Sequence, residues 1–212
     1  MTPARTAAVA LAATLTIQVY VSFAATATAV LAPAIARDFG VEARWIGVFV
    51  GIVDAGGMFA SLASGGFIER YGPIRVSQGC VVLCAMGVAA TAVAPVHVVA
   101  LLGVAAIVIG LGYGPITPAS SQLLQRTAAP ARMALTFSIK QTGVPAGAAL
   151  SGALLPALTL TLGWRAAFAI TAIAGVVVVM ASQPVRRKLD VETNPHSRFT
   201  FAGIFGPLAL LR

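Results

Sequence analysis

The chain has 212 residues, of which 58% are hydrophobic and only 9% are charged, and its formal net charge is +8. A soluble domain carries roughly a quarter charged residues, so this composition excludes a water-soluble globular protein. The basic residues are scattered between apolar blocks and form no patch interleaved with aromatic residues, which argues against nucleic acid as the partner.

Six apolar blocks of about 19 to 28 residues follow one another, and each is long enough to cross ~30 Å of hydrocarbon as a helix. We therefore predict an all-α integral membrane protein in contact with the lipid bilayer. The predicted spans are 8–32, 45–66, 76–94, 98–122, 134–160 and 165–183. The expected domain plan is a six-helix bundle over 1–183, a cytoplasmic central loop over 184–199 and the truncated start of a seventh helix over 200–212.

The Lys and Arg residues fall mainly in alternate loops between these spans. With the N-terminus inside, the outer loops hold only Arg37, Arg44 and Arg165. The cytoplasmic segments then hold Arg5, Arg70, Arg75, Arg126, Arg132, Arg186, Arg187, Lys188 and Arg198. Because Lys and Arg accumulate in cytoplasmic loops, we expect the N-terminus in the cytoplasm.

The second and fifth spans share a pattern of small residues. Sliding the chain by 87 residues places Gly56, Ala60, Ser64 and Gly65 over Gly143, Gly147, Ser151 and Gly152. The second span runs inward and the fifth runs outward, so the two three-helix units have opposite orientations. Inverted repeats of this kind are typical of secondary transporters.

The loop between the second and third spans reads GGFIERYGPIR over 65–75. It resembles the signature of the major facilitator superfamily, which it matches in residue type and spacing at Gly65, Phe67, Glu69, Arg70, Tyr71 and Gly72. Pro73 stands where a basic residue is usual, and the charge has moved to Arg75. Gly72 permits a tight turn. The resemblance implies a cytoplasmic gate, in which Glu69 and Arg70 help to hold the inward mouth closed; the alternative is an ordinary basic loop.

Two further segments extend the resemblance over most of the chain. GLGYGPITPASSQLLQR over 110–126 resembles the fourth helix of the family, and KQTGVPAGAALSGALLPAL over 140–158, followed by GWR, resembles the fifth helix of bacterial members. The resemblance implies the N-terminal half of a transporter in a bacterial inner membrane, with a C-terminal six-helix half as its partner. Such carriers move a small solute by rocking two halves around a midplane site.

Lys140 lies about 12 Å into the fifth span, counted from Arg132 at 1.5 Å per residue. It shares a helix face with Gly147 and Ser151, a series of small residues that lets another helix approach closely. We therefore expect Lys140 to face protein or an aqueous cavity, where it attracts an anionic substrate or pairs with a carboxylate. The alternative is a lysine in the overhanging inner end of a long helix. Gln141 is a further candidate for substrate contact.

Asp54 is the acidic residue well inside a span, about 13 Å from the outer surface by the same helical rise. Burial disfavours a charged carboxylate, so Asp54 is a candidate for carrying a proton. The alternative is a structural hydrogen bond beside Gly57 and Ser61.

Polar residues recur at steps of four in the first and fourth spans: Thr14, Gln18, Ser22 and Thr26, and then Tyr113, Thr117 and Ser121. In the family the first and fourth helices line the central path, so Gln18 and Tyr113 are candidates for substrate contact. The alternative for both stripes is hydrogen bonding between helices, which we expect for the Ser and Thr residues.

No set of residues points to catalysis, a metal or a cofactor. The sequence lacks the Ser/His, paired-carboxylate or metal-ligand constellation of an intramembrane enzyme. Gly110, Gly112 and Gly114 have no preceding strand or following Lys-Ser/Thr, so we expect helix packing or kinking there rather than a phosphate loop. The predicted function is a secondary transporter. The alternatives are a six-helix binding or assembly protein and a half-size carrier acting as a homodimer.

Overall fold

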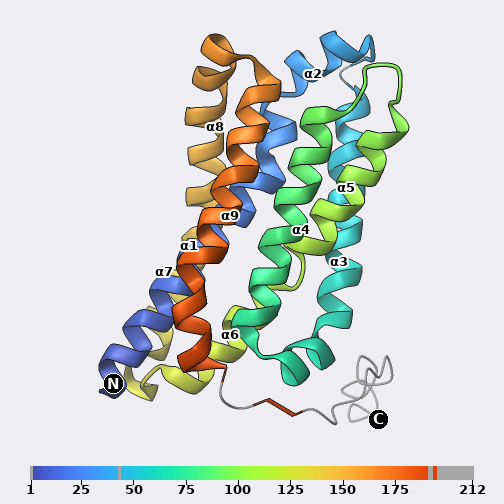
Figure 1. Ribbon diagram of the computed structural model, residues 1–212. Coiled ribbons are helices and arrows are strands. Elements are labelled where there is room, and N and C mark those ends of the chain that lie inside the picture. Colours follow the sequence, from blue (N-terminus) through green and yellow to red (C-terminus); the bar gives the residue numbers. More distant parts are fainter. Residues whose placement is uncertain (1, 43, 191–192, 195–212) are drawn as a thin grey trace.

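The computed structural model describes residues 2–42, 44–190 and 193–194. All regular structure in this part of the chain is helical (Figure 1). The elements are α1 (Pro3–Val30), α2 (Ala32–Phe39), α3 (Arg44–Tyr71), α4 (Pro73–Val93), α5 (Ala100–Tyr113), α6 (Ile116–Thr127), the 3₁₀ helix η1 (Pro130–Arg132), α7 (Met133–Gln141), α8 (Gly143–Leu162) and α9 (Trp164–Leu189).

Six helical segments of the described chain are long and apolar enough to cross a membrane, which confirms the predicted number of spans. The fourth span consists of α5 and α6, and the fifth runs from η1 through α7 and α8. The short helix α2 follows the first span directly and is not predicted by any apolar block. α9 continues to Leu189, past the predicted end at residue 183, because the Arg-Arg-Lys-Leu run that follows Val185 consists of good helix formers. Of the predicted loop over 184–199, residues 184–189 belong to α9, and 191–192 and 195–199 lie outside the described residues, as does all of 200–212.

The fourth and fifth spans are each interrupted near their middle. α5 ends at Tyr113 and α6 begins at Ile116, with Gly114 and Pro115 between them. In the fifth span α7 ends at Gln141 and α8 begins at Gly143. Proline removes one helical hydrogen bond and its ring crowds the preceding turn, which accounts for the break at Pro115 and, through Pro145, for the break after Gln141.

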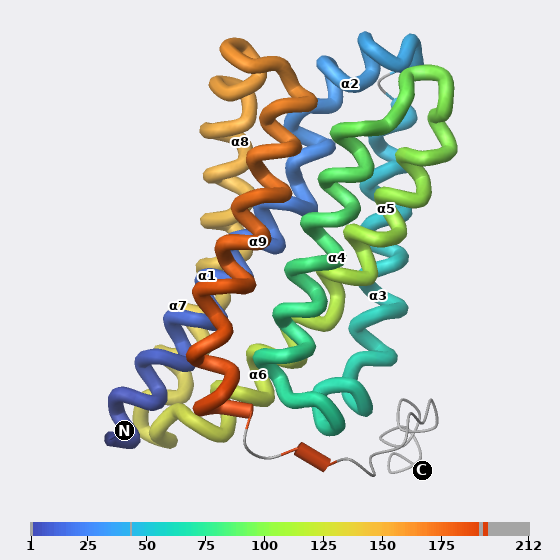
Figure 2. Tube along the Cα trace, in the orientation of Figure 1, coloured from blue at the N-terminus to red at the C-terminus, as the bar shows by residue number. Residues whose placement is uncertain are grey.

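The six spans pack in two groups, and each group contains spans from both three-helix units. α1 lies with α8 and α9, whereas α5 lies with α3 and α4, and α4 packs along α9 between the groups (Figures 1 and 2). If spans one, two and three are exchanged with spans four, five and six, the pairings of α1 become those of α5, and the pairing of α4 with α9 is unchanged. This arrangement agrees with the two inverted repeats that the sequence predicts.

Glycines allow α5 to approach α3 and α4 closely. A Cβ atom on Gly110 would overlap the carbonyl oxygen of Val53, and one on Gly112 would lie 2.8 Å from Sγ of Cys84. A Cβ atom on Gly114 would overlap the carbonyl oxygen of Gly57. The prediction that these glycines serve packing and kinking is confirmed, since small residues are what membrane helices need for close contact.

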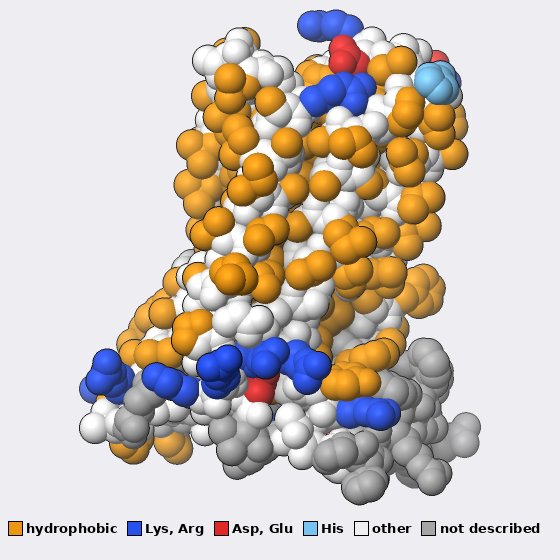
Figure 3. Space-filling model, in the orientation of Figure 1, with side chains coloured by type: hydrophobic (Ala, Val, Ile, Leu, Met, Phe, Trp, Pro, Cys, Tyr) orange, Lys and Arg blue, Asp and Glu red, His pale blue; other side chains and the backbone are white. Residues whose placement is uncertain are grey.

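Charged side chains gather at the two ends of the bundle, and apolar side chains cover the middle (Figure 3). At one end Trp164 donates a hydrogen bond from Nε1 to Oδ2 of Asp38 at 2.7 Å, which ties the start of α9 to α2. Arg165 donates from Nη1 to the carbonyl oxygens of Ala92 and Ala94 at 2.8 and 2.9 Å. These bonds satisfy carbonyl groups at the C-terminal end of α4, which that helix leaves without intrahelical partners.

Candidate functional site

α8 packs closely against α1 because small side chains face each other along the contact. A Cβ atom on Gly147 would overlap the carbonyl oxygen of Val19 and would lie 2.7 Å from Cβ of Ser22. The Ser22 hydroxyl donates a hydrogen bond to the carbonyl oxygen of Val144 at 2.7 Å. The predicted close approach along the face of Gly143, Gly147 and Ser151 is confirmed, and α1 is the helix that approaches.

Lys140 is buried one turn before this contact. Its side chain is only 2% exposed, and every other residue of α7 is at least partly exposed. The ammonium group makes no hydrogen bond or ion pair with any residue that the structure describes. The prediction that Lys140 faces protein is therefore confirmed, and the side chain does not extend along lipid. A buried cation without a partner is costly to the fold.

Gln18 lies on α1 against Gly143, which follows Lys140 by one helical turn. Its side chain is 1% exposed and packs against Gly143, where a Cβ atom would lie 3.0 Å from Cγ of Gln18. The Oε1 atom of Gln18 is buried without a hydrogen-bond partner in the described chain. Its neighbours in the stripe are satisfied, because Thr14 donates to the carbonyl oxygen of Ala10 at 2.9 Å and Ser22 donates to α8. Gln18 therefore retains an acceptor that the fold does not use.

Tyr113 and Asp54 form a second pair of polar residues, on α5 and α3. The Tyr113 ring packs against Gly57, where a Cβ atom would lie 3.5 Å from Cδ1 of the ring. Asp54 is one turn before Gly57 on α3, and its side chain is exposed. The structure places no hydrogen bond between Asp54 and any described residue, so the structural hydrogen bond beside Gly57 and Ser61 is absent here.

The two pairs occupy corresponding places in the two three-helix units. Gln18 and Lys140 lie where α1 meets α7 and α8, and Tyr113 and Asp54 lie where α5 meets α3. The shift of 87 residues that aligns the second and fifth spans places Asp54 over Gln141, the neighbour of Lys140. Gln141 itself is exposed, so the structure does not bring it together with Gln18.

The segment predicted as a loop over 65–75 is mostly helical, because α3 continues past the predicted end at residue 66, and only a tight turn remains at the basic end of the bundle. α3 ends at Tyr71, α4 begins at Pro73, and Gly72 between them has φ of 90°, which side-chain-bearing residues rarely adopt. The guanidinium carbons of Arg70 and Arg75 lie 5.5 and 5.9 Å from the centre of the Tyr71 ring. The predicted turn at Gly72 is confirmed, and both arginines rest on an aromatic face.

Asp190, which follows α9, binds the first turn of α4. Its Oδ1 accepts a hydrogen bond from the backbone amide of Ile74 at 2.9 Å, and its Oδ2 accepts one from the amide of Arg75 at 2.8 Å. Burial raises the pKa of this carboxyl, while the two amides and the charges of Arg186 and Arg75 oppose the rise. The sequence analysis does not single out Asp190. Two features of the sequence could have indicated this contact. Asp190 directly follows the basic end of a helix, and the helix that begins after Gly72 has free backbone amides in its first turn.

Comparison with known proteins identifies the family. The family model described as "Major Facilitator Superfamily" matches residues 14–210. The chain belongs to the major facilitator superfamily. This match and the six apolar helices of the described residues make it a multi-pass membrane protein, as the sequence predicts. Among the described residues, no group of three His, Cys, Asp or Glu side chains could hold a metal ion.

Two similar proteins are considerably longer than this chain. The Hexuronate transporter of Bacillus subtilis (strain 168) is 24% identical over 151 residues, which are 71% of this chain and 35% of the relative. The in meso crystal structure of the POT family transporter PepTSo has a TM-score of 0.66 and 17% identity, and the match covers 92% of this chain and 39% of that one. The chain thus spans little more than a third of either protein.

Proposed function

We propose that the chain forms one six-helix wall of a secondary transporter for a small anionic solute, a sugar carboxylate of the hexuronate class. We place it in a bacterial inner membrane with its N-terminus in the cytoplasm, because the basic residues gather at the end that holds the N-terminus. In this proposal Lys140 binds the carboxylate of the solute and Gln18 binds one of its hydroxyl groups.

The burial of Lys140 carries the proposal. A cation with 2% exposure and no partner in the described chain destabilises the fold until an anion joins it. Ionisable residues at membrane depth are rare and commonly mark a substrate or ion pathway. A hexuronate, the solute named for the Bacillus subtilis relative, bears one carboxylate. This carboxylate would be the negatively charged partner that Lys140 does not have in the described chain.

Gln18 supplies a neutral contact next to that charge. Its free Oε1 can accept a hydrogen bond from a sugar hydroxyl. A site that combines one cation with an amide acceptor discriminates against solutes lacking either group, because the unmatched buried group is then left unpaired. A neutral hexose is therefore a poor substrate in this proposal.

A second six-helix unit completes the path in our proposal. The matched relatives are more than twice as long as this chain, and transporters of this kind rock two halves around a central site. We assign the loop residues Gly65, Glu69, Arg70, Gly72 and Arg75 to the gate between the halves. Tyr113 lines the path opposite Gln18, and Gln141 contacts the solute only when the halves rearrange.

Asp54 is our candidate for coupling transport to protons. Its carboxylate lies inside a span, is exposed on the face of α3 and has no hydrogen bond to a described residue. A carboxylate at such a position can exchange its proton with each half-cycle, because its charged form is favoured only where water reaches it.

The proposal is tested by solute uptake into proteoliposomes that contain the complete carrier. Glucuronate, glucose and glucitol share most of their hydroxyl groups, and only the first carries a carboxylate. We expect uptake of glucuronate and little uptake of the two neutral solutes. Equal uptake of glucuronate and glucose would show that no cation in the path selects the substrate.

A further inference from the structure

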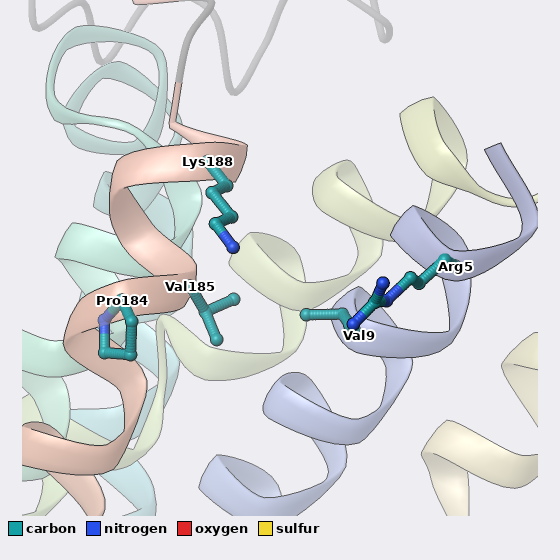
Figure 4. Close-up of a pocket in the computed structure, with 5 residues that line it drawn as sticks. All are labelled: Arg5, Val9, Pro184, Val185 and Lys188. Atoms are coloured by element: carbon teal, nitrogen blue, oxygen red, sulfur yellow. The ribbon is translucent and has the colours of Figure 1, made fainter. Parts of the chain in front are cut away.

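A cavity at the basic end of the bundle lies between α1 and α9, apart from the proposed transport path. It has a volume of about 190 Å³ and is lined by Arg5 and Val9 from α1 and by Pro184, Val185 and Lys188 from α9. Arg5 and Lys188 extend from the two helices toward the same space (Figure 4). The walls below them are apolar.

The positive charge in this cavity is not neutralised by the described chain. Neither Arg5 nor Lys188 forms an ion pair or hydrogen bond with a described residue. Asp190 follows Lys188 by two residues, but its two carboxylate oxygens accept the amides of Ile74 and Arg75 at the start of α4. A cavity that holds two cations and no acid attracts an anion.

The apolar wall of the cavity continues along the outside of α9. Ile173, Val177 and Met180 are 62, 61 and 66% exposed. They precede Pro184 and Lys188 at steps of three and four, so the five residues share one face of α9. From Pro184 to Ile173 this stripe measures about 16 Å, roughly half the thickness of the ~30 Å hydrocarbon layer. The surface therefore joins a cationic end to an apolar track one leaflet long.

We propose that this surface binds an anionic phospholipid of the leaflet that contacts the basic end of the bundle. The phosphate lies between Arg5 and Lys188, and an acyl chain packs along the stripe from Pro184 to Ile173. Arg forms paired hydrogen bonds with phosphate and Lys adds a point charge, while the apolar stripe takes the part of the lipid that a soluble phosphate lacks. The proposal requires membrane insertion only and is independent of the transported solute.

The test compares two double variants that lose the same charge from the same end. Arg5→Gln/Lys188→Gln removes the cations of the cavity, and Arg132→Gln/Arg187→Gln removes two exposed cations that do not line it. Each purified protein is titrated with phosphatidylglycerol, with phosphatidylcholine of the same acyl chains and with inorganic phosphate. Native mass spectrometry measures the bound lipid.

We expect the unaltered chain to prefer phosphatidylglycerol over phosphatidylcholine. The cavity variant should bind phosphatidylglycerol roughly 30-fold more weakly, because each basic residue near a membrane surface contributes about fivefold. The control should stay within about threefold, since neither Arg132 nor Arg187 lines the cavity. If the cavity variant does not fold, Arg5→Gln and Lys188→Gln alone should each weaken binding about fivefold.

Three results would overturn the proposal. Equal losses in the two double variants would assign lipid binding to the general positive charge of this end. Equal binding of phosphatidylglycerol and phosphatidylcholine would show that the cations do not recognise the headgroup. Displacement of the lipid by millimolar inorganic phosphate would show a site for a soluble anion rather than for a lipid.

Discussion

The side chain of Asp190 occupies the space beside Gly72 where any other residue would place its Cβ atom, although the two residues lie in different three-helix units. A Cβ atom on Gly72 would lie 2.5 Å from Cγ of Asp190. The carboxylate accepts two amide hydrogen bonds at the start of α4, where the helix dipole favours a negative charge. The glycine of the 65–75 loop therefore does two things: it adopts a positive φ and it admits a cap from the end of α9.

Replacing Gly72 by alanine should destabilise the bundle. The new Cβ atom meets Asp190 and the backbone keeps a φ of 90°, so we expect a loss of roughly 2–4 kcal/mol. Both cysteines of the chain, Cys80 and Cys84, are buried and free. A thiol-reactive dye that labels them on unfolding measures the change in the unfolding temperature.

Gly79→Ala is the matched control for this substitution. Gly79 lies within α4 and a Cβ atom there meets no atom within 4 Å, so this variant should be as stable as the unaltered chain or slightly more stable. A second comparison isolates the steric contact, because Gly72→Ala combined with Asp190→Ala should cost less than the two single changes added together. Strict additivity would argue against direct contact between the two residues.

Asp190→Asn should change how stability depends on pH. Burial raises the pKa of Asp190 in the folded chain, so the folded chain holds this proton more tightly than the unfolded chain. The contribution of Asp190 to stability is therefore largest when the carboxyl is protonated, and it falls as pH rises from the usual carboxyl pKa to the raised value. Unfolding temperatures at several pH values should show this decline for the unaltered chain, and Asp190→Asn should lack it. The same decline in both proteins would assign it to another group.

Gly147→Ala tests the contact between α1 and α8. The added methyl group overlaps the backbone carbonyl oxygen of Val19, which cannot rotate away, so we expect a loss of about 1–3 kcal/mol. Gly152→Ala is the control, since a Cβ atom there meets nothing within 4 Å. Equal unfolding temperatures for the two variants would mean that α1 and α8 can separate without cost.

The six spans and the small-residue contacts could be predicted from the sequence because each depends on a local pattern. An apolar block of about 20 residues has to cross the bilayer as a helix, and glycines at steps of four must face another helix when a membrane protein packs. The burial of Lys140 follows from the same reasoning, since it shares its face with Gly147 and Ser151.

The contacts that depend on distant segments could not be predicted in this way. The cap formed by Asp190 on α4 joins residues 116 positions apart at Ile74, and the hydrogen bond from Trp164 to Asp38 joins α9 to α2. Single-sequence patterns carry no information on such pairs. Helix α2 escaped prediction for a different reason, because eight residues are too few to cross a membrane.

Asp54→Asn in the complete carrier tests proton coupling. We expect uphill, proton-driven uptake to fall to the level of passive equilibration, because an amide cannot bind and release the proton. Exchange of labelled for unlabelled solute needs no net proton movement and should persist. Unaltered uphill uptake would remove Asp54 from the coupling mechanism, and loss of both activities would indicate a role in binding or folding instead.

The central claim is that the buried ammonium of Lys140 binds the carboxylate of the solute, and substitution of this residue tests it most directly. Glucuronate and glucose uptake are measured for the unaltered carrier, Lys140→Arg and Lys140→Gln. Our account predicts that Lys140→Gln lowers kcat/KM for glucuronate about 100-fold, corresponding to ~3 kcal/mol, while Lys140→Arg retains part of the activity. It also predicts an unfolding temperature for Lys140→Gln at or above that of the unaltered protein, because a buried charge is removed. Glucuronate uptake by Lys140→Gln at the unaltered rate would contradict the account.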